Sequence, residues 1–179
     1  MKKLYMISPL ALILCFMVGC QDKKALAELE AMKAEAAVEE QNKELVRNFF
    51  EELDKGNAEI ISELYISDAV SYSPSGSTTP TSPEELVEMT KMFYDAFPDL
   101  AHSIKELIAS GDKVIARVTA RGTHKGEFYS IPATGNKIEL SFIVIVRIEN
   151  GKFVEQRQEI DMLGFMQQLG MKLKPKEKE

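Results

Sequence analysis

Residues 137–161, with the sequence KIELSFIVIVRIENGKFVEQRQEID, contain the pattern that decides the fold. From Ile138 to Glu149, apolar side chains alternate with a second set that is apolar only in the middle of the run. A period of two is typical of a β-strand, and apolar residues on both faces indicate a strand that is covered on both sides for part of its length. Asn150-Gly151 then favours a tight hairpin turn, because both residue types accept positive φ angles.

The return strand, residues 153–161, is more polar than its partner. Its two faces carry Glu155, Arg157, Glu159 and Asp161 on one side, and Val154, Gln156, Gln158 and Ile160 on the other. Charged side chains beside an apolar strand are either solvated or line a cavity, because burying an unpaired charge is costly. The sequence alone leaves both alternatives open.

Composition excludes several classes of function. The chain has 179 residues, 45% of them hydrophobic, which suits one folded domain with appendages. Its formal net charge of -6 argues against a nucleic-acid partner. The two histidines, His102 and His124, do not form a ligand-spaced pair, so we expect no metal site. The sequence also lacks a glycine-rich phosphate loop and a Gly-x-Ser-x-Gly elbow.

The N-terminus has the pattern of a secretory signal. Two lysines precede a short apolar run at residues 10–18, which ends at Gly19-Cys20 and is too short to span a bilayer of about 30 Å. This junction resembles a bacterial lipobox, in which the cysteine is lipidated and becomes the first residue of the mature chain. The alternative is an ordinary signal peptide followed by an incidental cysteine.

The lipobox interpretation predicts a protein anchored to a membrane of the cell envelope through lipidated Cys20, outside the cytoplasm. Because Gln21 rather than aspartate follows the cysteine, we expect the outer membrane in a bacterium that has two membranes. The predicted organisation is a signal peptide at 1–19, a lipid anchor and helical spacer at 20–41, a folded domain at 42–170 and a disordered basic tail at 171–179. The spacer is rich in Ala, Glu, Lys and Leu, which favour helix.

Within the folded domain, periodicity and capping signals predict an α+β fold with helices first and a mostly antiparallel sheet after them. Asn57 is expected to cap a short second helix. Ser82-Pro83-Glu84-Glu85 has the cap, the first-turn proline and the acidic residues of a helix start. The expected helices lie near 45–53, 60–64, 83–97 and 163–169, and the expected strands near 69–73, 100–109, 114–121, 138–148 and 153–161.

Several short motifs in this order resemble the SnoaL-like polyketide cyclase, or ester cyclase, family of the nuclear transport factor 2-like superfamily. They cover about 130 residues, from Asn42 to Gly170. The motifs are VRNFF at 46–50, AFPDL at 96–100, GDKV at 111–114, GTHKGEF at 122–128, IPATG at 131–135, RIENGK at 147–152, DMLG at 161–164 and QQLG at 167–170.

The resemblance implies a cone-shaped domain, in which a curved sheet wraps around helices and encloses an apolar pocket. Family members of known chemistry close a ring by intramolecular aldol condensation without a metal or organic cofactor. A carboxylate takes the proton beside a carbonyl, and pocket donors hold the enolate oxygen. The resemblance places this carboxylate at Asp161. A strand-end aspartate can instead cap the helix that follows it.

The other candidates for the pocket or its rim are Tyr72, His124, Arg147, Glu155 and Arg157. The resemblance places Tyr72 and Arg147 where family members often have histidine. His124 can be a donor at the pocket mouth or a loop histidine bonded to nearby backbone, and Glu155 with Arg157 can form a substrate clamp or a structural ion pair.

Two classes of function remain open at this stage. One is a cofactor-independent enzyme, a cyclase or isomerase, acting on a small apolar carbonyl compound. The other is a non-catalytic module of the same fold that binds a small ligand or another protein. The strand at 138–148 is apolar on both faces, so we also expect a homodimer that covers the second face of the sheet.

Overall fold

The computed structural model describes residues 9–172 and 174, which form two compact units divided between Val38 and Glu39. The first helix, α1 (Pro9–Asp54), is continuous from the expected spacer into the folded domain. Continuity follows from the sequence, because residues 20–54 contain neither glycine nor proline. Residues 1–8 of the expected signal peptide, the Cys20 side chain and most of the expected tail lie outside what is described. No helix within residues 9–172 is long and apolar enough to cross a membrane.

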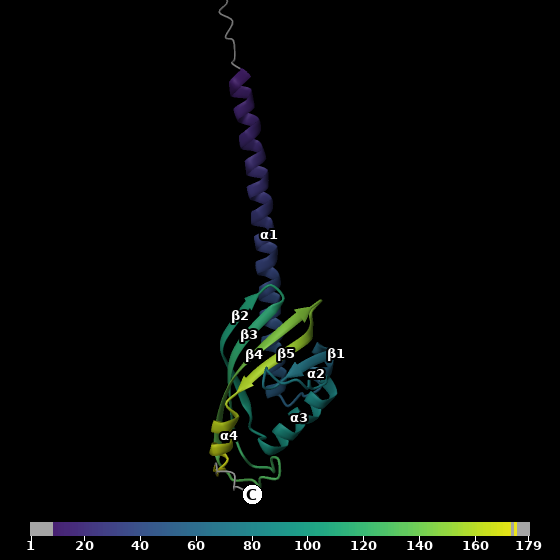
Figure 1. Cartoon of the computed structure of the whole chain (residues 1–179), viewed down its shortest axis with the longest axis vertical. Helices are drawn as coiled ribbons and strands as arrows, with labels where there is room; N and C mark the ends of the chain where they lie inside the picture. The colour runs from purple at the N-terminus through teal and green to yellow at the C-terminus, as the bar shows by residue number, and fades with distance from the viewer. Residues whose placement is uncertain (1–8, 173, 175–179) are drawn as a thin grey trace, which may run out of the picture. The chain divides into compact units, whose positions relative to one another are not determined.

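The unit that begins at Glu39 is a mixed α+β domain with a curved five-stranded sheet, so the predicted fold class is confirmed (Figure 1). Its helices precede most of the sheet in sequence. After α1 the elements are α2 (Ile60–Leu64), β1 (Tyr65–Tyr72), α3 (Pro83–Ala96), β2 (Ala101–Ser110), β3 (Lys113–Thr123), β4 (Lys137–Glu149), β5 (Lys152–Ile160) and α4 (Met162–Gln168).

The sheet has the strand order β1-β5-β4-β3-β2. β2 to β5 pair antiparallel in sequence order, and β1 pairs parallel with β5. This register puts Ser71 directly beside Gln156 on the neighbouring strand. It also places His102 beside Ala120, on the inner face of β2 and β3. Residues from both ends of the sheet therefore reach the same enclosed space.

The β4–β5 hairpin forms as the sequence predicts. Asn150 and Gly151 have φ angles of 51° and 72°, the pair of positive values that a type I′ turn requires. The predicted start of α3 is also confirmed, since Ser82 and Glu85 form a reciprocal capping box and Pro83 occupies the first turn. The prediction for α2 is wrong: its N-cap is Glu59, and the Asn57 side chain donates to Glu52 instead.

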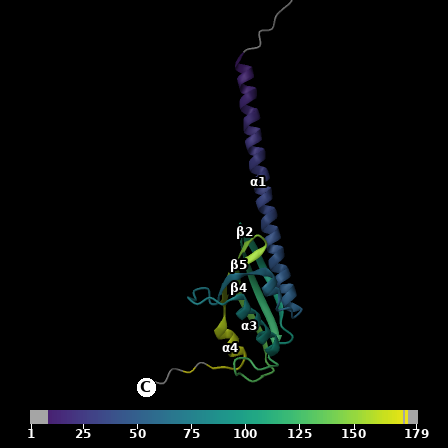
Figure 2. The same ribbon diagram turned by 90° about the vertical axis from the view of Figure 1, so that its right-hand side faces the viewer.

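The hydrophobic core lies between the concave face of the sheet and the helices. Figures 1 and 2 show the sheet curving around α3 and the end of α1. Aromatic rings join these layers: the Phe49 ring centroid lies 5.6 Å from that of Phe153, and the Phe50 centroid lies 6.2 Å from that of Phe142. Between these contacts the layers do not close completely, and the remaining space forms the candidate site.

Candidate functional site

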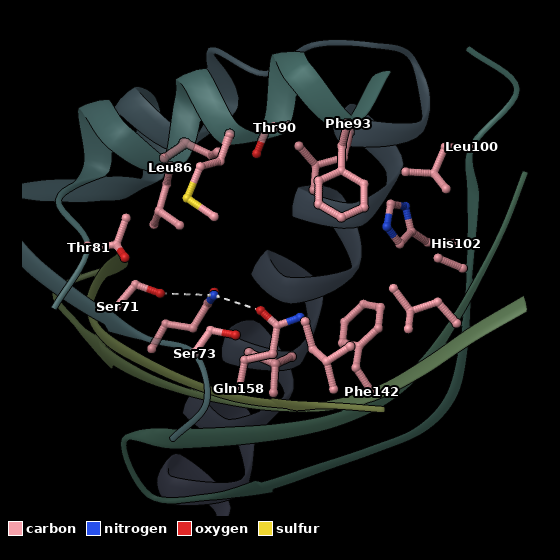
Figure 3. A pocket seen from close by; sticks show the side chains of 18 of the residues that line it. Ser71, Ser73, Thr81, Leu86, Thr90, Phe93, Leu100, His102, Phe142 and Gln158 are labelled. Atoms are coloured by element: carbon pink, nitrogen blue, oxygen red, sulfur yellow. Dashed lines mark hydrogen bonds between the residues drawn. The ribbon is translucent and has the colours of Figure 1, made fainter. Parts of the chain in front are cut away.

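A cavity of about 370 Å³ lies between the inner face of the sheet and α1, α2 and α3 (Figure 3). Its volume is at the lower end of the range for small-molecule sites. Most of its lining is aromatic or aliphatic, including Phe50, Leu86, Phe93, Leu100, Phe142 and Val144. Polar groups lie around His102 at one end and around Ser71, Ser73 and Gln158 at the other, and Thr90 on α3 lies between these ends (Figure 3).

His102 lines one end of the cavity and is held there by Asp54, the last residue of α1. The Nδ1 atom of His102 lies 2.6 Å from Oδ1 of Asp54. The same carboxylate accepts the backbone N–H of His102, at 2.9 Å and 3.1 Å from its two oxygens. Because a carboxylate only accepts, Nδ1 carries a proton, and in the neutral ring the lone pair is therefore on Nε2. Nε2 has no hydrogen-bond partner in the part of the chain that the structure describes.

The His102 ring also packs against aromatic side chains, with centroids 5.2 Å from Phe50 and 6.2 Å from Phe142. Its side chain is 9% exposed, whereas that of Asp54 is 31% exposed. The imidazole is therefore enclosed, while the carboxylate that orients it still meets solvent. In its neutral form, an imidazole in this position can accept a proton from a ligand in the cavity.

Tyr94 on α3 adds a third polar group near this end. Its hydroxyl oxygen is buried and has no hydrogen-bond partner among the described residues. Burial raises the pKa of Tyr94, and the negative charge of Asp54 raises it further. Tyr94 therefore stays protonated at neutral pH. A buried hydroxyl without a partner carries a desolvation cost that a bound ligand or water can relieve.

The polar groups at the opposite end form a hydrogen-bonded chain across β1 and β5. Tyr65 donates its hydroxyl to Oε1 of Gln156. Nε2 of Gln156 lies 3.4 Å from the Ser71 hydroxyl and 3.5 Å from Oε1 of Gln158. Gln156 is buried, with 8% exposure, so these contacts replace the water that its carboxamide loses on folding.

Asp161, expected as the catalytic base, occupies a different position. It is the N-cap of α4, and its Oδ1 accepts the backbone N–H of Gly164 at 2.8 Å. A Cβ atom at position 164 would lie 2.2 Å from Oδ2 of Asp161, so glycine permits this close approach. The side chain is exposed and does not line the cavity. The geometry assigns Asp161 to helix capping, the alternative that the sequence left open.

Four other candidates, Tyr72, Arg147, Glu155 and Arg157, lie on the outer face of the sheet and do not line the cavity. The Arg157 guanidinium lies 4.4 Å from the centre of the Tyr72 ring, and its Nε is 2.6 Å from Oε1 of Glu155. Arg147 approaches the other oxygen of Glu155 at 3.7 Å. Arg157 also donates to the backbone oxygen of Ser75 at 2.8 Å. These residues connect β4 and β5 to the loop that follows β1.

His124 is fully buried outside the cavity. Its Nδ1 accepts the backbone N–H of Thr134 at 3.3 Å and lies 3.0 Å from the Thr134 hydroxyl. The ring stacks on Phe97 with a centroid distance of 5.1 Å. These contacts support the interpretation of a loop histidine, because they hold His124 against Thr134 in the connection between β3 and β4. No contact among the described residues places His124 at the pocket mouth.

Sequence reasoning did not identify His102, Asp54 or Gln158 as site residues. His102 and Asp54 are 48 positions apart, and no motif joins them. The alternation of β5 could have identified Gln158, because Gln158 lies on the face opposite Glu155 and Arg157. Within residues 9–172, no group of three or more His, Cys, Asp or Glu side chains is arranged to hold a metal ion.

The sequence profile of the SnoaL-like polyketide cyclases matches residues 44–169, most of the chain. The chain belongs to the SnoaL-like polyketide cyclase family. One relative is aklanonic acid methyl ester cyclase DauD of Streptomyces sp. (strain C5), which is 28% identical over 134 residues, covering 71% of this chain and 80% of DauD. The family resemblance seen in the motifs is therefore confirmed.

Solved structures agree with this membership. AclR of Streptomyces galilaeus, a proposed hydroxylase, superimposes with a TM-score of 0.68 at 26% identity, covering 74% of this chain and 97% of AclR. IdmH of Streptomyces antibioticus, a proposed polyketide cyclase, gives a TM-score of 0.64 at 28% identity, covering 73% of this chain and 99% of IdmH. This SnoaL-like protein shares its fold with relatives to which different chemistries are ascribed, so the fold alone does not define its reaction.

Proposed function

We propose that this SnoaL-like protein is an acid/base enzyme that acts on a small, largely apolar carbonyl compound without a metal or organic cofactor. The observation that carries the proposal is the pairing of His102 with Asp54 at the wall of the apolar cavity. The pairing leaves the Nε2 lone pair of a neutral imidazole available to a bound molecule. The base is therefore His102, in place of the carboxylate expected at Asp161.

The reaction class is intramolecular aldol cyclisation or isomerisation. Nε2 of His102 takes the proton from a carbon beside a carbonyl, and the electron pair of the C–H bond forms the enolate. In a cyclisation, the enolate carbon attacks a second carbonyl carbon of the same molecule, and the imidazolium returns its proton to the new alkoxide. The Thr90 hydroxyl points into the cavity from α3 and can donate to the enolate oxygen (Figure 3).

The open cavity also supports the enzyme over a protein-interaction module. A cavity filled by side chains would leave only outer surfaces for function, whereas about 370 Å³ remains here between the layers. The relative DauD also supports an enzyme, since it is named as a cyclase of a methyl ester. A non-catalytic small-ligand binder remains the alternative, and the two differ in whether bound carbonyl compounds exchange their α-protons.

We place the protein at the cell envelope, anchored through a lipid on Cys20. The lipobox-like junction Gly19-Cys20 and the Ala/Glu/Lys-rich helix after it support this proposal. Wild-type protein should fractionate with membranes, and Cys20→Ser should move it to the soluble fraction. Mature protein with an unlipidated N-terminus would contradict the proposal.

Native mass spectrometry of protein purified from its own cells tests the ligand class. We expect a co-purified small molecule that contains carbonyl oxygen. Val144→Phe, which fills the cavity from the inner face of β4, should lose this ligand. The exposed substitution Ile143→Phe on the next residue is the matched control and should keep it. A ligand that is retained by Val144→Phe would place binding elsewhere and contradict the proposed site.

A further inference from the structure

At the end of the cavity opposite His102, the hydrogen bonds run in one donor-to-acceptor direction, from Tyr65 through Gln156 to Gln158. Tyr65 is buried, with 6% exposure, and burial raises the pKa of its hydroxyl, so it remains a donor at neutral pH. Its acceptor is Oε1 of Gln156. The oxygen of this carboxamide therefore faces Tyr65, and its NH₂ group faces away from Tyr65.

The next contacts extend this direction to the cavity. The NH₂ group of Gln156 meets the Ser71 hydroxyl and Oε1 of Gln158. Because Oε1 of Gln158 is used as an acceptor, the NH₂ group of Gln158 is on the far side of its carboxamide. Figure 3 shows this carboxamide inside the cavity, between Ser73 and Phe142. Within the described residues, the Gln158 NH₂ group has no acceptor.

A donor that has no acceptor among the described residues, in a largely apolar cavity, selects for a ligand oxygen. We propose that Gln158, oriented through Gln156 by Tyr65, is the specificity-determining residue that binds a second oxygen function of the substrate, a ketone or ester carbonyl. This inference rests on the proposed function, because it defines which carbonyl compounds place their reacting carbon at His102. The substrate class is a compound with two carbonyl groups joined by an apolar body.

The shape and lining of the cavity fit such a molecule. Ser71, Ser73 and Gln158 lie at one side in Figure 3, and His102 lies at the other. Between them are the side chains of Phe93 and Phe142, which offer only apolar contact. A ligand with one oxygen function would satisfy one end and leave the other unpaired. A ligand with two would satisfy both, which gives discrimination because a donor that a bound ligand covers without pairing is costly.

Two matched compounds test the role of Gln158. Methyl 4-acetylbenzoate has an ester and an acetyl group on one ring, and 4-propylacetophenone keeps the acetyl group but replaces the ester with an alkyl chain. Equilibrium dialysis gives the dissociation constant of each. The wild-type protein should prefer the ester by about three- to tenfold, the amount that one hydrogen bond contributes. Gln158→Met, which keeps the chain length and removes the NH₂ group, should abolish the preference.

Tyr65→Phe tests the orientation of the chain. Without the tyrosine donor, Gln156 can turn over, and the preference should fall although Tyr65→Phe leaves the Gln158 side chain in place. Gln167→Met, an exposed substitution of the same type on α4, should keep the full preference. Thermal melting shows that each variant is folded. Equal affinity of the two compounds for wild-type protein, no measurable binding of either, or a preference that survives in Gln158→Met would overturn the inference.

Variants at the other end separate this inference from the proposed reaction. His102→Gln should retain the preference for the ester, because Gln158 is unchanged. If the preference is present but the wild-type protein does not accelerate proton exchange from the acetyl group, the acid/base function fails while the role of Gln158 stands. If the protein accelerates proton exchange but shows no preference for the ester, the role of Gln158 fails while the acid/base function stands.

Discussion

His102 and Asp54 are joined by two kinds of hydrogen bond. The side-chain bond from Nδ1 to Oδ1 is 2.6 Å long, and the backbone N–H of His102 donates to the same carboxylate. Because both donors belong to one residue, the carboxylate sets the position of the strand and the orientation of the ring together. The end of α1 and the start of β2 thus form one hydrogen-bonded pair from residues far apart in sequence.

Asp54→Asn tests whether the tautomer matters. The asparagine NH₂ group can donate to Nδ1, which moves the ring proton to Nε2 and removes the lone pair that faces the cavity. Proton exchange from a bound carbonyl compound should fall roughly 10²-fold or more. Asp68→Asn, an exposed change of the same type, should have no effect. An unchanged rate in Asp54→Asn, with a normal melting temperature, would contradict the tautomer argument.

Tyr94→Phe tests the cost of the buried hydroxyl. Removing a polar group that has no partner should leave the free energy of unfolding unchanged or raise it by up to about 1 kcal/mol, because a buried unpaired hydroxyl is destabilising. Urea denaturation measures the difference. A loss of more than about 1 kcal/mol would show that the hydroxyl has a stabilising partner in solution.

Asp161 can be assigned by comparing two substitutions. Asp161→Ala should lower the free energy of unfolding by about 1 kcal/mol, whereas Asp161→Asn should change it by only a few tenths, because asparagine caps helices about as well as aspartate. Neither change should slow proton exchange in the cavity. A large loss of exchange in Asp161→Asn with unchanged stability would restore the catalytic assignment.

We expect the outer face of the sheet to form a homodimer interface. Ile108, Ile115, Ile143 and Ile145 are 57%, 39%, 44% and 38% exposed on neighbouring strands of this face. Such apolar patches usually mark an interaction site. Ile145→Lys should reduce the mass in solution from dimer to monomer, as measured by light scattering, while Leu163→Lys on α4 should not. A wild-type monomer at micromolar concentration would contradict the prediction.

The sequence predicted the fold better than the site, for a physical reason. The β4–β5 hairpin and the start of α3 depend on local signals, the Asn150-Gly151 turn and the Ser82–Glu85 capping box. The His102–Asp54 pair depends on which strand end meets which helix end, and this contact appears only in the folded chain. The alternation of β5 correctly separated its two faces. The charged face, with Glu155 and Arg157, is the outer one, and the face with Gln156 and Gln158 lines the cavity.

The central claim is that His102 removes a proton from a carbon beside a carbonyl. The most direct test is proton NMR of methyl 4-acetylbenzoate in D₂O, which follows the loss of the acetyl methyl signal as deuterium replaces hydrogen. Wild-type protein should accelerate this exchange over buffer, and His102→Gln should reduce the acceleration by roughly 10²–10⁴-fold while the protein stays folded. Exchange that His102→Gln catalyses as fast as wild type, or a wild-type rate equal to buffer, would contradict the claim.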